Sequence, residues 1–215
     1  MGVNGGGCEK EEGGSRDRNG VGSLVDADLR ECVIEVKRIS DRMIFIKLVV
    51  GRIFVNIVSA YAPHVGLDEE VKRLFWENLN AVVRGIHSTE KIFIGEDFNG
   101  HIITTSNGFD DVHEDFGFEE RNGGGVSLLE FAKAFELVIA NSYFLKRDNQ
   151  LVTFSSTIAR TQIDYLLLQK GDRGLCKDCK LVVLEKQLPR FFGYREESLV
   201  VVKEIGGGME KYKAK

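Results

Sequence analysis

Residues 91–101 constrain the fold more than any other part of the sequence. Residues 92–94 form a short apolar run without alternation, which is typical of a strand that is buried on both faces. A glycine ends the run, and Asp97 and Asn99 follow two positions apart. If the backbone stays extended there, both side chains point to the same face. The sequence therefore predicts a buried strand with a carboxylate and an amide at its end.

This pair of side chains has two interpretations. A carboxylate can bind or deprotonate a water, and an amide can hold that water or a phosphate oxygen, as metal-assisted hydrolysis requires. Asp, Asn and Gly are also common turn residues, so a strand that ends in a polar turn is the alternative. Spacing alone does not decide between them.

Length and composition indicate one soluble globular domain. The chain has 215 residues, of which 43% are hydrophobic and 29% are charged. The net charge of -4 gives no global attraction to nucleic acid, although a local basic groove is compatible with it. No apolar run approaches the length of a membrane span, so we expect no membrane partner.

The ends of the chain and its cysteines set further expectations. Residues 1–20 are rich in glycine and charge, which predicts a disordered start and no secretory signal. We expect the domain itself over residues 21–185 and a C-terminal extension over 186–215. The four cysteines, one pair of them a Cys-x-x-Cys, predict free thiols in the cytoplasm or nucleus rather than a disulfide framework or a zinc site: Cys8, Cys32, Cys176 and Cys179.

Two β-rich runs, residues 43–50 and 53–61, lie on either side of a Gly-Arg link. A two-residue link with glycine first predicts a hairpin with a type II′ turn. The second strand must leave the sheet before Pro63, because proline cannot continue a central ladder. Tyr61 is therefore a second polar group at a strand end.

Helical periodicity follows in two places. Residues 68–86 keep an apolar stripe, and Asp68 is the expected N-cap. After a long polar loop, Ser127 is expected to cap a second helix, with Glu130 completing a capping box. The apolar face of this helix is expected to include Val138.

The next strands are predicted at residues 151–154 and 162–168, with short apolar runs at 181–184 and 199–202. Asp164 is a carboxylate within an apolar strand, and burying it without a partner would be costly. It is either hydrogen-bonded to backbone amides for structural reasons, or it is an acid that orients a histidine.

Three segments in this order, residues 59–63, 97–101 and 162–166, carry a resemblance to a known family. Their sequences are Ser-Ala-Tyr-Ala-Pro, Asp-Phe-Asn-Gly-His and Gln-Ile-Asp-Tyr-Leu. Together they resemble the endonuclease/exonuclease/phosphatase superfamily. The set is most similar to the craniofacial development protein 2-like proteins and the endonuclease domains of LINE-type retrotransposons, over residues 19–183.

The resemblance implies an α/β (α+β) fold, a four-layered sandwich of two packed mixed sheets with helices outside. It also implies cleavage of a DNA phosphodiester that depends on Mg²⁺ or Mn²⁺. Asp97 matches the acid that activates the attacking water, and Asn99 matches the residue that holds water or phosphate. Both are implied metal ligands. Tyr61 matches the tyrosine that contacts phosphate, and Asp164 matches the aspartate that orients the catalytic histidine.

The chain also departs from the family pattern. The family has a metal-binding glutamate and an asparagine on strands where this chain has its glycine-rich start. It has a histidine segment after the Cys-x-x-Cys, where Lys180 and an apolar run follow directly here. Glu96 stands where the family usually has glycine. We therefore expect an N-terminally truncated domain with weak or absent activity.

Two alternatives to an active endonuclease remain open. One is a non-catalytic, retrotransposon-derived remnant or binding module. The other is a phosphatase of the same superfamily.

Overall fold

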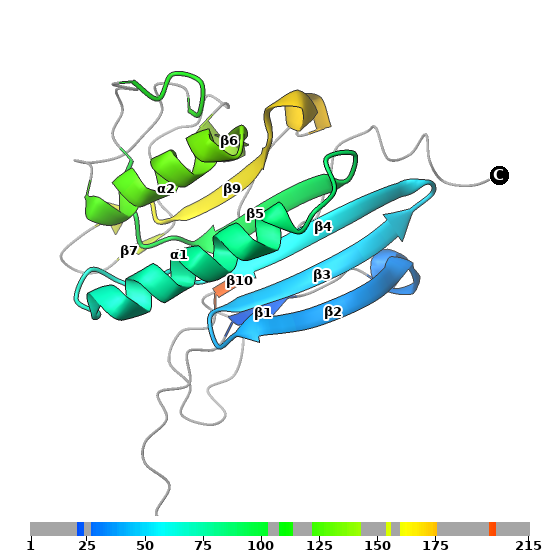
Figure 1. Ribbon diagram of the computed structural model, residues 1–215, viewed down its shortest axis with the longest axis horizontal. Coiled ribbons are helices and arrows are strands. Elements are labelled where there is room, and N and C mark those ends of the chain that lie inside the picture. Colours follow the sequence, from blue (N-terminus) through cyan, green and yellow to red (C-terminus); the bar gives the residue numbers. More distant parts are fainter. Residues whose placement is uncertain are drawn as a thin grey trace, which may run out of the picture.

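A six-stranded mixed sheet is the centre of the fold (Figure 1). The computed structural model describes residues 21–23, 27–102, 108–113, 122–142, 154–155, 160–175 and 198–200. Across the sheet the strands are β2 (Val33–Ser40), β3 (Met43–Val50), β4 (Ile53–Ala60), β5 (Lys91–Asp97), β9 (Asp164–Gln169) and β6 (Leu137–Ile139).

The predicted hairpin is confirmed, because β3 and β4 pair antiparallel from Met43 opposite Ala60 to Val50 opposite Ile53. Gly51 has a φ of +64°, the left-handed conformation that a primed turn requires and that glycine adopts at little cost. β4 and β5 are parallel, and α1 (Glu69–Arg84) makes the crossover between them. β9 then pairs antiparallel with both β5 and β6.

Helices α1 and α2 (Gly123–Ala134) cover one face of the sheet (Figure 1). The core beneath them contains several completely buried side chains, including Leu79, Ile94 and Tyr165. Trp76 packs against this core, with ring centroids 6.3 Å from Phe98 and 5.5 Å from the ring of a phenylalanine in α2. The prediction that Trp76 belongs to the core or its flank is therefore confirmed.

The opposite face of the sheet is also apolar. Its buried residues form a second cluster, packed against Leu29 of the short 3₁₀ helix η1 (Ala27–Cys32). The strands β1 (Val21–Ser23) and β10 (Ser198–Val200) form a parallel pair on this side (Figure 1). The mixed sheet with outer helices agrees with the predicted α/β architecture. The members of the second cluster are Ile46, Leu48, Val55, Phe93, Val138, Ala140 and Leu168.

The first helix begins and ends close to its prediction. Asp68 occupies the N-cap position as predicted, but its side chain accepts no capping hydrogen bond. Glu69 and Glu70 place negative charge at the positive end of the helix, as expected.

The second helix begins five residues before its predicted start. Asn122 is the N-cap and accepts a hydrogen bond from the Gly125 amide at 2.8 Å. Ser127 lies within the helix and donates its hydroxyl to the Gly123 carbonyl, so the predicted capping box is wrong. Val138 was also misplaced, because the helix ends at Ala134 and Val138 lies in β6.

Several predictions fall on residues outside the described part. These are residues 1–20, 151–153, 181–184, 186–197 and 201–215, with Cys8, Cys176 and Cys179. Cys32 is a free thiol, as predicted. Within the ranges that the structure describes, no helix is long and apolar enough to cross a membrane.

Candidate functional site

Two buried carboxylates face each other where β5 ends and β9 begins. Asp97 pairs directly with Asp164 in the antiparallel register, and their exposed fractions are only 8% and 7%. Both lie on the face opposite α1 and α2, because their neighbours Phe98 and Tyr165 belong to the helix-covered core. Like charges opposite each other in a sheet repel, so this arrangement favours a bound cation or strong donors.

Tyr61 lies beside Asp97. The parallel register pairs Ser59 with Gly95, and the Ala62 amide continues the ladder by donating to the Asp97 carbonyl at 2.8 Å. Two residues beyond Ser59, Tyr61 is therefore at the level of Asp97 and on the same face. The structure brings together three of the four predicted site residues in neighbouring strands.

The backbone conformation at Asn99 differs from the expected one. The strand ends at Asp97, and Asn99 has a φ of +46°, so the extended backbone assumed for residues 97–99 is wrong. The Asn99 amide donates to Asp97 Oδ1 at 2.7 Å, which closes a tight turn. Its side-chain Nδ2 donates to the Ala62 carbonyl at 2.7 Å. This bond leaves the side-chain oxygen of Asn99 as the atom that could bind a cation.

Asn122 holds the turn after β5, and the sequence did not identify it. Its Oδ1 accepts from the amides of His101 at 2.9 Å and Gly125 at 2.8 Å, and its Nδ2 donates to the Asn99 carbonyl at 3.3 Å. The start of α2 packs so closely on this turn that a Cβ on Gly125 would lie 1.8 Å from the His101 carbonyl oxygen. Asn122 and this glycine therefore fix the backbone on which Asn99 lies.

Arg42 is a second residue that the sequence motifs did not indicate. It immediately precedes β3, and its carbonyl accepts from the Tyr61 amide at 2.9 Å. Its guanidinium carbon lies 5.2 Å from the centroid of the Tyr61 ring, a cation–π contact. Its exposed fraction is 7%. We call the four side chains that cross the end of β3, β4, β5 and β9 the polar row: Arg42, Tyr61, Asp97 and Asp164.

The polar row contains no histidine. Within the described ranges, no group of three or more His, Cys, Asp or Glu residues could hold a metal ion. The donors that are present still fit a hard cation, because two carboxylates and the side-chain oxygen of Asn99 are the ligand types that Mg²⁺ and Mn²⁺ prefer. Glu96 contributes backbone pairing with Tyr165.

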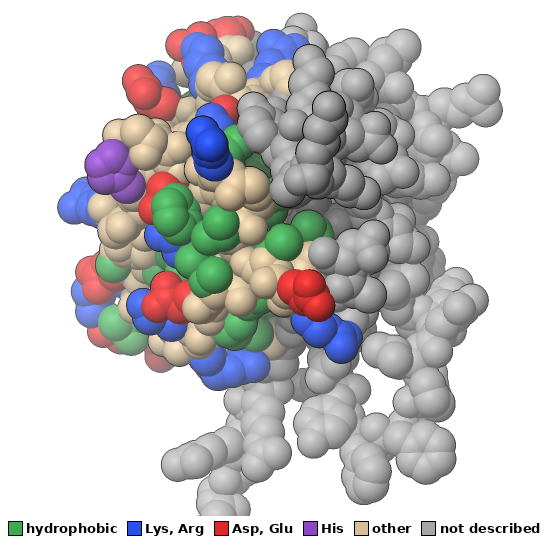
Figure 2. Space-filling view, turned by 90° about the vertical axis from the view of Figure 1, so that its right-hand side faces the viewer, with side chains coloured by type: hydrophobic (Ala, Val, Ile, Leu, Met, Phe, Trp, Pro, Cys, Tyr) green, Lys and Arg blue, Asp and Glu red, His purple; other side chains and the backbone are tan. Residues whose placement is uncertain are grey.

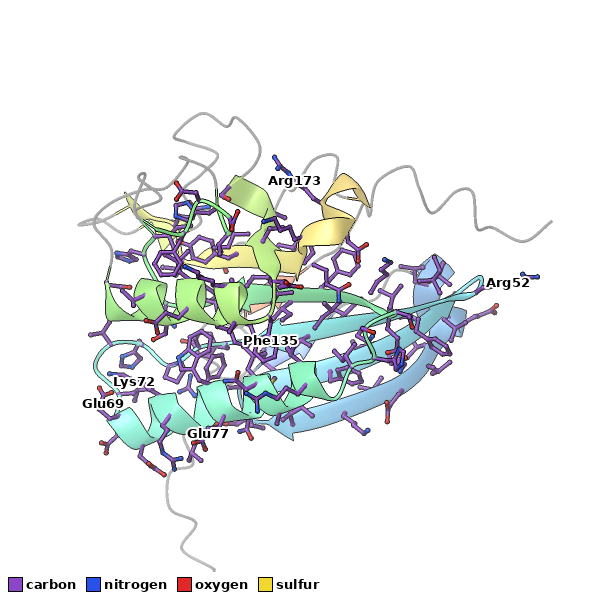
Figure 3. All side chains as sticks on the ribbon, turned by 45° about the horizontal axis from the view of Figure 1, so that its top comes forward. Arg52, Glu69, Lys72, Glu77, Phe135 and Arg173 are labelled. Carbon is purple, nitrogen blue, oxygen red and sulfur yellow. The ribbon has the colours of Figure 1, made fainter. Side chains whose placement is uncertain are left out.

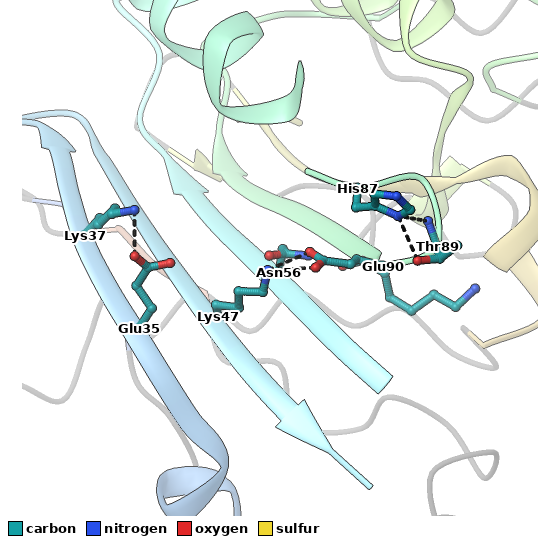
Figure 4. A network of polar contacts seen from close by, with 8 residues as sticks. Glu35, Lys37, Lys47, Asn56, His87, Thr89 and Glu90 are labelled. Carbon is teal, nitrogen blue, oxygen red and sulfur yellow. Dashed lines mark hydrogen bonds and ion pairs between the residues drawn. The ribbon is translucent and has the colours of Figure 1, made fainter. Parts of the chain in front are cut away.

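The opposite end of the same strands carries a different polar cluster (Figure 4). Lys47 donates to both carboxylate oxygens of Glu90 at 2.8 Å, and Asn56 donates to one of them at 2.9 Å. The hydrogen bond from Lys47 is the main reason that the pKa of Glu90 lies below its usual value. We call this set the Lys47–Glu90–Asn56 network.

Acidic and basic side chains are interspersed around apolar ones on the described part of the face at the hairpin end (Figure 2). The described residues of this face therefore form no patch of one charge.

No family model matches the sequence. Two curated relatives nevertheless match it in sequence, and both carry the name of a protein that its motifs predict. In particular, it is similar to craniofacial development protein 2 of Bos taurus, with 27% identity over 165 residues, and of Tragulus javanicus, with 26% over 165 residues. These matches cover 76% of this chain and 28% of each relative. The chain thus spans just over a quarter of their length.

Solved structures align with the chain at lower identity and with TM-scores below 0.5. The endonuclease domain of TRAS1, a telomere-specific non-LTR retrotransposon, aligns with a TM-score of 0.47 and 16% identity, over 71% of this chain and 61% of that domain. A humanized D. rerio TDP2 aligns with a TM-score of 0.40 and 8% identity, over 64% of this chain and 51% of the other.

Proposed function

We propose that this chain is an endonuclease-like phosphodiesterase domain that acts on DNA, with its site at the polar row. The observation that carries the proposal is the direct pairing of Asp97 with Asp164, both buried, beside Tyr61. Like charges opposite each other destabilise a sheet, and a bound cation reduces their repulsion. A site that binds a cation and a phosphate would use both carboxylates.

Each residue then has a chemical task. Asp97 accepts a proton from the attacking water, and Asp164 adds negative charge beside it. The Tyr61 hydroxyl donates a hydrogen bond to a non-bridging phosphate oxygen, where charge develops during in-line displacement. Mg²⁺ or Mn²⁺, held by the Asp97 carboxylate and the Asn99 side-chain oxygen, would polarise the same phosphate.

We further propose that catalysis is weak. The polar row supplies no imidazole, and the described residues give the cation few ligands. Loss of one preorganised donor typically lowers a rate by about a hundred- to a thousand-fold. The Asn99 turn keeps its amide oxygen available, so binding should persist where turnover is slow.

A second candidate is a non-catalytic DNA-binding module. The same absence of a third acidic or histidine ligand among the described residues favours it. In this case the polar row binds a phosphate and releases it unchanged.

Plasmid nicking with Mg²⁺ separates the two candidates. We expect slow nicking by the wild type, and a loss of about a hundred-fold or more in Asp97→Asn. Asp111→Asn is the matched control, because Asp111 pairs on the surface with Lys170 and its side chain is 83% exposed. Equal rates for wild type and Asp97→Asn would refute catalysis at this site and would support the binding module.

A further inference from the structure

Arg42 has a charge that the described part of the protein does not neutralise. Its exposed fraction is 7%, and its Nη1 is buried without a hydrogen-bond partner. A guanidinium stays charged at any physiological pH, and native proteins rarely leave a buried donor unsatisfied. In the described ranges its guanidinium contacts the Tyr61 ring, its backbone amide donates to the Ser40 hydroxyl, and its carbonyl accepts from the Tyr61 amide.

Other arginines of the chain show how unusual this is. Arg73 forms ion pairs with Glu70 and Glu77 on the surface of α1, and Arg38 donates to the carbonyls of Val21 and Ser40. Within the described ranges, no carboxylate lies at ion-pair distance from Arg42. A buried guanidinium is expected to have more partners than an exposed one. Here Arg42, the most buried of the three, is the one whose guanidinium has no ion pair and no carbonyl partner in the described part of the chain.

The position of Arg42 in the sheet indicates which kind of ligand could pair with its guanidinium. β3 and β5 lie on either side of β4, so the backbones of Arg42 and Asp97 are about 10 Å apart at the spacing of neighbouring strands. Arg42 and Tyr61 are in contact on the face that Asp97 also shares. An anion placed over Tyr61 would thus meet a guanidinium on one side and the carboxylate pair, with its cation, on the other.

We propose that Arg42 is an anion-binding residue of the polar row, and that it takes a phosphate oxygen of the DNA backbone. This proposal rests on the proposed function, whose site it extends by one residue. The planar fork of arginine suits two oxygens of one phosphate, which lysine cannot match with a single point of charge. The Tyr61 ring beneath the guanidinium holds it in place for that contact.

Binding measured without catalysis tests the proposal. A fluorescent DNA duplex is titrated with protein in EDTA at several salt concentrations, for wild type, Arg42→Met and Arg42→Lys. Arg52→Met is the control, because Arg52 lies in the hairpin turn at the far end of the sheet (Figure 3). We expect Arg42→Met to bind about tenfold or more weakly and to lose about one unit of salt slope, and Arg52→Met to change little.

Arg42→Lys controls for the case in which Arg42→Met does not fold. Arg42→Lys keeps the charge and loses the fork, so its affinity should lie between those of wild type and Arg42→Met. Inorganic phosphate provides a second arm, because it should raise the melting temperature of the wild type and raise that of Arg42→Lys less. An effect of phosphate equal in both proteins, together with equal DNA affinity, would overturn the proposal.

The outcomes also separate this proposal from the proposed function. If Arg42→Met loses DNA binding and the wild type does not nick, Arg42 binds phosphate and only the catalytic proposal fails. If the wild type nicks and folded Arg42→Met binds DNA as tightly, Arg42 has no role and the function stands. Wild type that binds neither DNA nor phosphate overturns the role of Arg42 as well.

Discussion

The two ends of the central sheet treat buried charge in opposite ways. At the hairpin end, Lys47 and Glu90 neutralise each other, and Asn56 donates to the same carboxylate. At the other end, the carboxyl groups of Asp97 and Asp164 lie opposite each other in the register, and the buried Nη1 of Arg42 has no hydrogen-bond partner among the described residues.

This difference distinguishes a structural cluster from a site. The Lys47–Glu90–Asn56 network pairs opposite charges, although within the described ranges the Asn56 Oδ1 is buried without a hydrogen-bond partner. The polar row sets two carboxylates opposite each other, and the buried Nη1 of Arg42 has no hydrogen-bond partner in the described part of the chain, which costs free energy. Proteins retain such local conflicts mainly where function requires them. The comparison therefore supports function at the polar row and stability at the network.

The largest effect on stability is expected at Gly125, which supports the site end. Alanine there would place its Cβ 1.8 Å from the His101 carbonyl oxygen, so the turn after β5 or the start of α2 must move. We expect Gly125→Ala to lower the free energy of unfolding by about 3 kcal/mol. Chemical denaturation measures this change.

Gly123→Ala is the matched control for that substitution. A Cβ on Gly123 meets nothing within 4 Å, and the residue lies in the same first turn of α2. Alanine should therefore be neutral or stabilise by about 0.5 kcal/mol. Equal destabilisation by both substitutions would show that the close contact with His101 does not limit the packing of α2.

Removing the charge of Glu90 is the next largest change and tests the structural end. Glu90→Gln leaves Lys47 half-buried without its counter-charge, so we expect a loss of about 2 kcal/mol in the free energy of unfolding. DNA affinity should stay at the wild-type value, since the network lies at the far end of the sheet. A lower DNA affinity of folded Glu90→Gln would contradict the assignment of a purely structural role to the network.

The same carboxylate makes stability depend on pH. The Lys47 hydrogen bond lowers the pKa of Glu90 below its ordinary value of 4.5. The stabilisation is therefore fully present above about pH 4.5 and is lost as the pH falls through the lower, folded-state pKa. Stability measured between pH 7 and pH 3 should fall less steeply for Glu90→Gln than for the wild type. Parallel curves would mean that Glu90 keeps its ordinary pKa.

The smallest effect is expected on the surface of α1. Arg73 pairs there with Glu70 and Glu77, and all three side chains are exposed to solvent. Glu77 is labelled on this surface in Figure 3. Exposed ion pairs contribute little because water and salt screen them. Arg73→Met should thus leave the melting temperature and DNA affinity unchanged. It sets the baseline against which both ends of the sheet are compared.

Local patterns predicted the elements whose sequence signals agree with the fold. The unbroken apolar run of β5, the glycine link between β3 and β4 and the helical stripe of α1 each have a single interpretation. Motif order added the site residues Tyr61, Asp97 and Asp164, which the sheet register places together. Their assignment to catalysis stays a prediction.

The elements that the sequence did not predict correctly are those that depend on tertiary contacts. The edge strand β2 was not predicted; its Ile34 and Val36 are 55% and 62% exposed, so it carries no clear burial pattern. β6 has only three residues, and Val138 also fits the stripe of the preceding helix. The early start of α2 depends on Gly124 and Gly125, which pack closely on the backbone of the turn after β5. No local signal distinguishes such glycines from those of a loop.

Arg42 differs from these misses because the sequence did contain a usable signal. The hairpin sets Met43 opposite Ala60, so the residue before one is beside the residue after the other. A two-residue turn at Gly51 and Arg52 is sufficient to specify that register, and the register alone places Arg42 next to Tyr61. The burial of Arg42 and its open Nη1 depend instead on tertiary packing, which strand pairing does not specify.

The melting temperature in the presence of Mn²⁺ tests the central claim most directly. The wild type, Asp97→Asn and Glu90→Gln are each heated with and without the ion. At a concentration ten times the dissociation constant, binding stabilises the folded state by about 1.4 kcal/mol. We predict this gain for wild type and for Glu90→Gln, despite its lower starting stability, and no gain for Asp97→Asn. An equal gain in Asp97→Asn would contradict a cation site at the polar row.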